Sequence, residues 1–310
     1  MSSGLETDLL LDRRRLKRRL FFWRGLAVAA VLLAVLTLVR GLLPMGEAHV
    51  ARLNVSGIIT DDRRLVEAII GVGNDSNAKA LIVSIDSPGG SVSGGTSLHA
   101  AIGRVAAKKP VVAVMGGTAA SAGYMIAMPA AWVFARDATL TGSIGVLLQT
   151  GEVSGLLAKL GIGSETTVSG PLKDQPSLTH PTSEAGWAVL NGLVADWYEQ
   201  FVEIVAAGRH MPAARVRELA DGRPYTGRQA LKLGLVDAIG FEPEARAWLQ
   251  AERQVAADLP VHDVEQRGLV ERTFGDALGS IFGGTAKSVF AQWLNIDAAQ
   301  ALWQPGLTAR

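Results

Sequence analysis

The sequence predicts an α/β fold with a parallel sheet, preceded by one membrane-spanning helix. From residue 48 onward, short apolar runs alternate with glycine turns and helical stretches, which is typical of βα units. Before residue 46, a basic run leads into an apolar stretch without a charge, from Gly25 to Val39. With 310 residues and 48% hydrophobic content, the chain can bury a large core.

The first 45 residues have the features of a signal anchor. The basic run Arg13–Arg19 precedes the apolar stretch, which places the N-terminus in the cytoplasm by the positive-inside rule. The stretch spans roughly 22 Å as a helix, so apolar flanks have to complete a bilayer core of about 30 Å. We predict a cytoplasmic tail at 1–24, a transmembrane anchor at 25–45 and an extracytoplasmic, periplasmic remainder. A cleaved signal peptide is the alternative, with a weak cleavage site at Gly46 and Ala48.

Charge and composition exclude several classes of function. Residues 1–45 hold eight basic and three acidic side chains, so the remainder is slightly acidic, given the overall net charge of +1. Nucleic-acid binding needs clustered basic side chains, so no nucleic-acid partner is expected. The absence of cysteine excludes disulfides, a thiol nucleophile and cysteine-bound metal. The chemistry considered below requires no metal or cofactor.

Four short apolar runs are the predicted strands: His49–Asn54, Ala80–Ile85, Pro110–Met115 and Ala131–Ala135. The helical stretch Gly95–Lys108 has crossover length, which predicts that the strands on either side of it are parallel neighbours. Within the second and third runs, Ile82-Val83 and Val111–Val114 are fully apolar, as is usual for strands that are buried on both faces.

The second half of the chain is mostly helical by pattern. A long helix should follow Pro181, with Ser183 as its cap and a core stripe made by Leu190, Val194, Trp197, Phe201 and Ile204. Thr226 should cap a shorter helix. We expect one domain over residues 46–255. A helical extension over 256–310 is predicted from the apolar period that runs from Val270 to Ile281.

Two glycine-rich turns could carry chemistry. The turn Asp86–Val92 follows a predicted buried strand, and the amides of Gly89, Gly90 and Ser91 could point at a ligand oxygen, which suits an oxyanion hole. In the second turn, Ser121 stands among small residues before an apolar helical stretch. A helix N-terminus would favour a serine nucleophile there.

A nucleophilic serine needs a base, and two kinds are possible. A Ser-His-Asp triad stays open because its members need not be close in sequence, although none of the five histidines has a convincing context. Lys173 is the other candidate, after a probable strand at Glu165–Val168. An ordinary lysine is protonated near neutral pH, so a lysine base requires burial or a nearby cation. Ser143 could orient such an amine.

Taken in order, five motifs resemble peptidase family S49, in the short form of signal peptide peptidase A. The motifs are Asp86-Ser87-Pro88-Gly89-Gly90, Ala120-Ser121-Ala122-Gly123-Tyr124, Thr141-Gly142-Ser143-Ile144-Gly145, Gly170-Pro171-Leu172-Lys173-Asp174 and Tyr225-Thr226-Gly227. The resemblance covers roughly residues 48–250. It implies a crotonase-like (ClpP-like) fold and a membrane-anchored serine endopeptidase that cleaves remnant signal peptides. Asp86 is a departure, since the family more often has asparagine at that position.

The resemblance also implies a role for each matching residue. Ser121 would be the nucleophile, Lys173 the general base, and Ser143 the hydroxyl that positions the lysine. Gly89 would supply the oxyanion amide, with Gly90 beside it. The family resemblance further implies a homo-oligomeric ring, in which serine and lysine of one site come from neighbouring subunits. Two alternatives remain: an acyl-CoA hydratase or isomerase of the same fold, and an inactive membrane-tethered scaffold that binds peptides.

Overall fold

The computed structural model describes residues 21–35 and 47–264, and residues 21–35 are helical. Among the helices in these ranges, none combines the length and the hydropathy that a membrane crossing requires. The predicted anchor at 25–45 overlaps the described helix over residues 25–35 only. Its remaining residues lie outside the described ranges, as does the helical period predicted from Val270 to Ile281.

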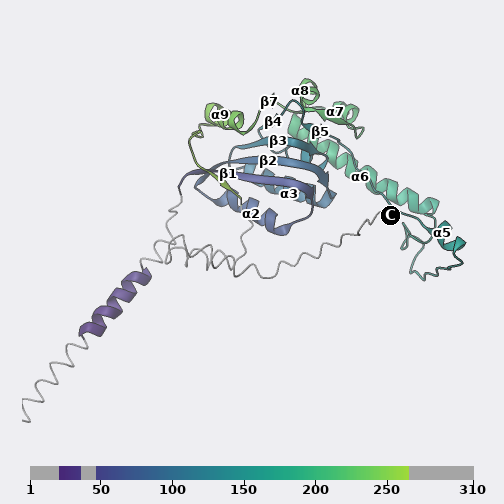
Figure 1. Cartoon of the computed structure of the whole chain (residues 1–310), viewed down its shortest axis with the longest axis horizontal. Coiled ribbons are helices and arrows are strands. Elements are labelled where there is room, and N and C mark those ends of the chain that lie inside the picture. The colour runs from purple at the N-terminus through teal and green to yellow at the C-terminus, as the bar shows by residue number, and fades with distance from the viewer. Residues whose placement is uncertain (1–20, 36–46, 265–310) are drawn as a thin grey trace, which may run out of the picture. The chain divides into compact units, whose positions relative to one another are not determined.

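Within residues 47–264, the chain forms a mixed sheet whose strands are almost all parallel (Figure 1). The strands are β1 (His49–Ile59), β2 (Ala78–Gly90), β3 (Val111–Ala120), β4 (Trp132–Ala135), β5 (Leu140–Gly142), β6 (Pro224–Thr226), β7 (Ala238–Ile239) and β8 (Val261–Asp263). Their order is β6-β5-β3-β2-β1-β8, and β4 and β7 continue from β3. The β5–β6 pair is antiparallel.

Helices cover both faces of the sheet. They are α2 (Arg63–Asn74), α3 (Val92–Ala106), α4 (Ala122–Met125), α5 (Ser154–Lys159), α6 (Glu184–Arg209), α7 (Ala213–Leu219), α8 (Gly227–Leu233) and α9 (Glu242–Arg253). Figure 1 shows α2 and α3 on one side of β1 and β2, with α9 on the other. Alternate residues of β2 therefore enter different cores: Leu81, Val83 and Ile85 pack toward α3, and Ala80 and Ile82 pack toward α9.

The structure confirms most of the predicted elements. The four predicted strands are β1 to β4, and the crossover helix is α3, which begins three residues earlier than expected, after its cap Ser91. Ser183 caps α6 through a 3.0 Å bond from the Gly186 amide. Thr226 caps α8 in a reciprocal capping box with Gln229.

Three predictions about the second half differ from the structure. The strand expected at Glu165–Val168 is not formed, because that segment runs through an exposed loop between α5 and α6. The predicted core stripe of α6 is buried at Leu190 and Phe201 but only partly buried at Val194, Trp197 and Ile204. In the described part of the predicted extension, residues 256–264, the chain forms strand β8, which pairs with β1.

The pairing of β2 with β3 changes register near the carboxyl end of the strands. Ile85 pairs with Met115, and Ser87 pairs with Ala119, so β3 advances four residues while β2 advances two. The surplus of two residues forms a bulge at Gly116 and Gly117. Such a bulge is rare in a parallel pair, and bulges are common next to active sites, where they redirect a side chain.

Candidate active site

Ser121 lies at a strained turn between β3 and α4. Its backbone has φ 53° and ψ −123°, a region that non-glycine residues rarely adopt. The Ser121 amide donates to the Gly142 carbonyl at 2.9 Å, and its own carbonyl accepts from the amides of Tyr124 and Met125. Hydrogen bonds on both sides thus hold the strained residue in place. The predicted position of the serine at the start of a buried helix is confirmed, although α4 is only four residues long.

Gly89 lies directly against Ser121. It has φ +111°, and a Cβ atom added at Gly89 would come 2.8 Å from the Ser121 Cβ and 3.1 Å from the Ala120 carbonyl oxygen. A Cβ atom on Gly90 would come within 1.9 Å of the Ile59 carbonyl oxygen. Neither position has room for a side chain, so both glycines are required by the packing of β1, β2 and the Ser121 turn.

The amides of this turn are not all free, contrary to the prediction. The Gly89 amide donates to the Ser87 hydroxyl at 3.1 Å. The Ser91 amide donates to the Ile59 carbonyl at 2.9 Å, because β1 extends beside the turn. In this structure, Gly89 therefore presents its amide to Ser87 rather than to an empty oxyanion position.

Sequence reasoning missed the role of Ser87. Its side chain is fully buried, and its hydroxyl donates to the Gly57 carbonyl at 2.6 Å while it accepts from Gly89. The hydroxyl therefore ties the glycine turn of β2 to β1. A serine between an acidic residue and a proline looks like an ordinary turn residue, so the sequence carries no signal of this contact.

Ser143 is held in a second strained conformation, with φ 47°. Its amide donates to the Arg223 carbonyl at 3.1 Å, and the Gly222 amide donates to the Ile144 carbonyl at 3.1 Å. The preceding Gly142 has φ +74°, and the ring of Tyr225 fills the space beside it. The segment around β6 therefore fixes Ser143.

Ser121 and Ser143 line the same cavity, which has a volume of about 770 Å³. Its walls are mainly apolar and come from α3, α4, α6 and the segment after Ser143; they include Val92, Met125, Val146, Leu147, Val194, Tyr198 and Phe201. Asp221 lies at the same cavity, and its hydrogen bonds from Arg223 hold the pKa of the Asp221 carboxyl below its ordinary value. The cavity thus offers apolar contacts beside the two serines.

The structure does not bring Lys173 to this cavity within one chain. Lys173 is exposed in a turn, where its amide donates to the Gly170 carbonyl, and it is not among the described residues that line the Ser121 cavity. The burial expected of a lysine base is thus not provided by the residues of its own chain that the structure describes.

The histidines are also absent from the described lining of the Ser121 cavity. His49 stacks on His262 with ring centroids 4.4 Å apart, His180 contacts Thr179, and His210 ends α6. His99 lines a different cavity. All five lie in the described ranges, and none lines the Ser121 cavity.

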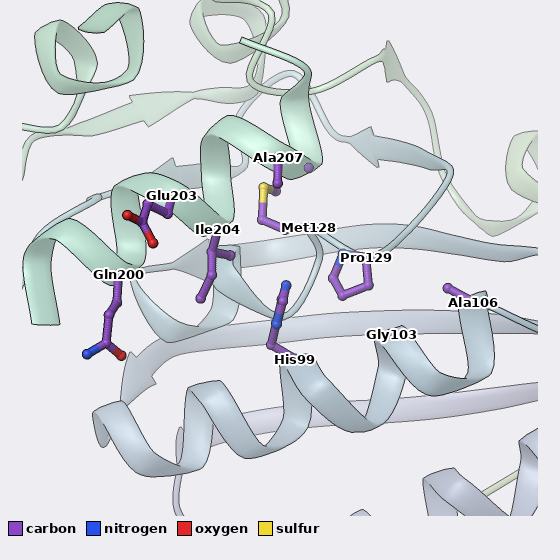
Figure 2. A pocket seen from close by; sticks show the side chains of 10 residues that line it. His99, Gly103, Ala106, Met128, Pro129, Gln200, Glu203, Ile204 and Ala207 are labelled. Carbon is purple, nitrogen blue, oxygen red and sulfur yellow. The ribbon is translucent and has the colours of Figure 1, made fainter. Parts of the chain in front are cut away.

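The cavity that contains His99 has a volume of about 630 Å³ and lies between α3 and α6 (Figure 2). Figure 2 shows His99 projecting from α3 toward α6, where Glu203 and Ile204 lie. Burial lowers the pKa of His99, which favours its neutral form. No predicted site residue lines this cavity.

A parallel sheet covered by helices, with glycine turns and a serine at the carboxyl ends of β2 and β3, is a ClpP-like α/β fold. The family model described as Clp protease matches residues 56–139. The model described as peptidase family S49 matches residues 104–256.

Curated proteins give the same assignment. The chain is 40% identical to "Putative protease slr0021" of Synechocystis sp. over 64% of this chain and 72% of that protein. It is 35% identical to "Putative signal peptide peptidase SppA" of Enterococcus faecium, over 66% and 64% of the two chains. It is 31% identical to "Putative protease MJ0651" of Methanocaldococcus jannaschii, over 73% and 76%. The chain belongs to peptidase family S49, and it is a peptidase.

Proposed function

We propose that the protein is a serine endopeptidase in which Ser121 is the nucleophile. The observation that carries the proposal is the contact between Ser121 and Gly89 at the wall of a cavity that Ser143 also lines. A strained serine at the start of a helix is suited to attack a carbonyl, and the Gly89 amide beside it would stabilise the resulting oxyanion once it leaves Ser87.

Lys173 is the proposed general base, and it is delivered by a neighbouring copy of the chain in a homo-oligomeric ring. Its exposure in a single chain supports this arrangement, because a second copy would bury it. The segment around Lys173 carries exposed apolar side chains that a partner copy could cover: Leu147, Leu156, Leu160, Ile162, Leu172, Leu178 and Trp187.

The proposed reaction is acyl transfer in two steps. The neutral Lys173 amine takes the proton of the Ser121 hydroxyl, and the Ser121 oxygen attacks the peptide carbonyl. The Gly89 amide turns from Ser87 toward the developing oxyanion, and Ser143 orients the lysine. Lys173 then passes the proton to the departing amine, and water hydrolyses the acyl-enzyme with the same base.

The proposed substrates are remnant signal peptides and similar apolar peptides at the outer face of the membrane. The apolar walls of the cavity support this class, because such peptides consist mostly of apolar side chains. The name of the Enterococcus faecium relative supports it as well. In this proposal, residues 25–45 anchor the chain in the cell membrane with the N-terminus in the cytoplasm and the peptidase domain outside.

Mixed mutants test the shared site. Ser121→Ala and Lys173→Ala should each abolish cleavage of a signal-peptide-like substrate, and a refolded mixture should recover part of the activity, since some sites then receive an intact serine and an intact lysine. Lys232→Ala removes an exposed lysine of α8, outside the segment proposed to contact a partner, and should keep full activity. Activity that survives in either single variant would refute the dyad. A mixture that stays inactive would place the dyad within one chain.

An inactive peptide-binding scaffold is the second candidate, because Lys173 does not line the Ser121 cavity of its own chain. A serine-directed fluorophosphonate separates the two functions. Labelling that depends on both Ser121 and Lys173 supports the peptidase. An unlabelled oligomer that binds the same peptides without cleaving them supports the scaffold.

A further inference from the structure

The β3 bulge determines which residue of β2 faces Ser121. Beyond the bulge, Ala119 pairs with Ser87, and the same register two residues further brings Ser121 level with Gly89. Without the two surplus residues, Ala119 would lie level with Gly89 and Ser121 would lie level with Ser91. At about 3.3 Å per strand residue, the bulge moves Ser121 by about 7 Å along β2.

Two polar side chains from neighbouring segments hold the bulge. The Asp86 carboxylate accepts a hydrogen bond from the Thr118 amide at 2.9 Å. On the other side, the Thr139 hydroxyl donates to the Gly116 carbonyl at 2.7 Å and accepts from the Arg136 amide. Asp86 thus fixes the Thr118 amide just after the bulge, and Thr139 fixes the carbonyl of its first residue, Gly116.

Gly116 leaves room for Asp86. A Cβ atom on Gly116 would lie 3.3 Å from the Asp86 Cβ and 3.1 Å from the Ile85 carbonyl oxygen, whereas one on Gly117 would make an ordinary contact with the Asp86 carboxylate at 3.5 Å. Thr139 is buried, whereas Asp86 is exposed apart from this contact. Neither residue lines the cavity that contains Ser121.

We propose that Asp86 and Thr139 are positioning residues of the peptidase, which hold the bulge at Gly116–Gly117 and thereby keep Ser121 level with Gly89. The inference rests on the proposed function of Ser121. Because neither side chain reaches the cavity, they act on the alignment of the nucleophile and not on substrate binding. A misplacement of about 1 Å in a reacting group can cost on the order of a hundredfold in rate.

The experiment measures kcat and KM of Asp86→Ala and Thr139→Val on a signal-peptide-like substrate. Both variants should lower kcat by roughly tenfold to a hundredfold and leave KM within about twofold, as expected for a misaligned nucleophile. Asp86→Asn and Thr139→Ser keep the acceptor oxygen and the hydroxyl, so they should recover most of kcat. Asp258→Ala removes an exposed carboxylate elsewhere and should behave as wild type.

Two results would overturn the inference while the proposed function stands. One is a wild-type kcat in Asp86→Ala and Thr139→Val, measured in a protein whose activity requires Ser121. The other is a loss of folded structure in both variants, by circular dichroism, which would make the two contacts general supports of the fold. A wild-type protein without Ser121-dependent activity refutes the proposed function instead.

Discussion

Gly89 and Ser121 are in such close contact that a single methyl group on Gly89 would overlap the Ser121 side chain, at 2.8 Å between the two Cβ atoms. The two residues come from different strand ends, separated by helix α3 in the sequence. Their contact therefore depends on the register of β2 with β3 and on the left-handed backbone of Gly89.

Gly89→Ala should remove activity. The added methyl group displaces Ser121, and the φ of +111° is strained for any side chain, so the Gly89 amide and the Ser121 side chain both move. We expect a fall in kcat of at least about a hundredfold, comparable to the loss of one oxyanion donor.

Gly71→Ala is the matched control for this substitution. Gly71 lies in helix α2 with nothing within 4 Å of an added Cβ, so the variant should keep its activity and gain about 0.4–1 kcal/mol in stability. Full activity in Gly89→Ala would mean that the Gly89 contact does not matter for the reaction.

Gly142→Ala should displace Ser143. The new Cβ would lie 2.6 Å from the ring of Tyr225, and the φ of +74° disfavours alanine. We expect lower activity and a lower midpoint of thermal unfolding. Gly142→Ala combined with Tyr225→Leu should restore part of the activity if the ring clash is the cause, and a double variant no better than the single one would assign the loss to backbone strain.

Arg209→Met should destabilise the domain. The Arg209 guanidinium is buried and makes two hydrogen bonds to the Asp237 carboxylate and one to the Gly234 carbonyl. Among the described residues, removing Arg209 leaves the largely buried Asp237 carboxylate with one side-chain hydrogen bond, from the Val133 amide, and the loss costs about 3–5 kcal/mol in the free energy of unfolding.

Urea unfolding measures this loss, with Arg217→Met as the control. Arg217 pairs with Glu199 at the surface, so its removal should have a much smaller effect. Equal losses in the two variants would contradict the importance of burial for the Arg209 pair.

His99 should make stability depend on pH. Because burial lowers its pKa in the folded state, the unfolded chain binds the His99 proton first as the pH falls, and stability is lost between the unfolded value of about 6.5 and the lower folded value. His99→Gln should therefore lose less stability than wild type between pH 7.5 and pH 5, measured by urea unfolding at both values. Parallel losses in the two proteins would contradict a contribution from His99.

The fold could be predicted well from the sequence because its central strands are long apolar runs. The apolar parts of β2 and β3 are buried on both faces, so their composition alone predicts that they are central strands. β5, β6, β7 and β8 have only two or three residues each, and their pairing is decided by distant partners rather than by their own pattern. The contact of Ser87 could not be predicted for the same reason, because its hydroxyl binds the carbonyl of Gly57 on another strand.

The site could be predicted only in part. The motif order predicted Ser121, Ser143 and Gly89 as site residues, and the structure brings these three together. The bulge that aligns them is invisible in the sequence, since Gly116-Gly117 reads as an ordinary turn after a strand. The pairing of Ser121 with Lys173 remains a prediction, because the structure describes a single chain.

The hydrogen bond from the Ser143 amide to the Arg223 carbonyl joins residues that are 80 positions apart in the chain. During synthesis, Ser121 and Ser143 leave the ribosome well before the segment that fixes Ser143. A nascent chain that ends before Arg223 consequently lacks one wall of the site. With Ser121 as the proposed nucleophile, proteolytic competence would arise late in biosynthesis, when nearly the whole domain has been made, and a truncated translation product would carry Ser121 without the segment that completes its site.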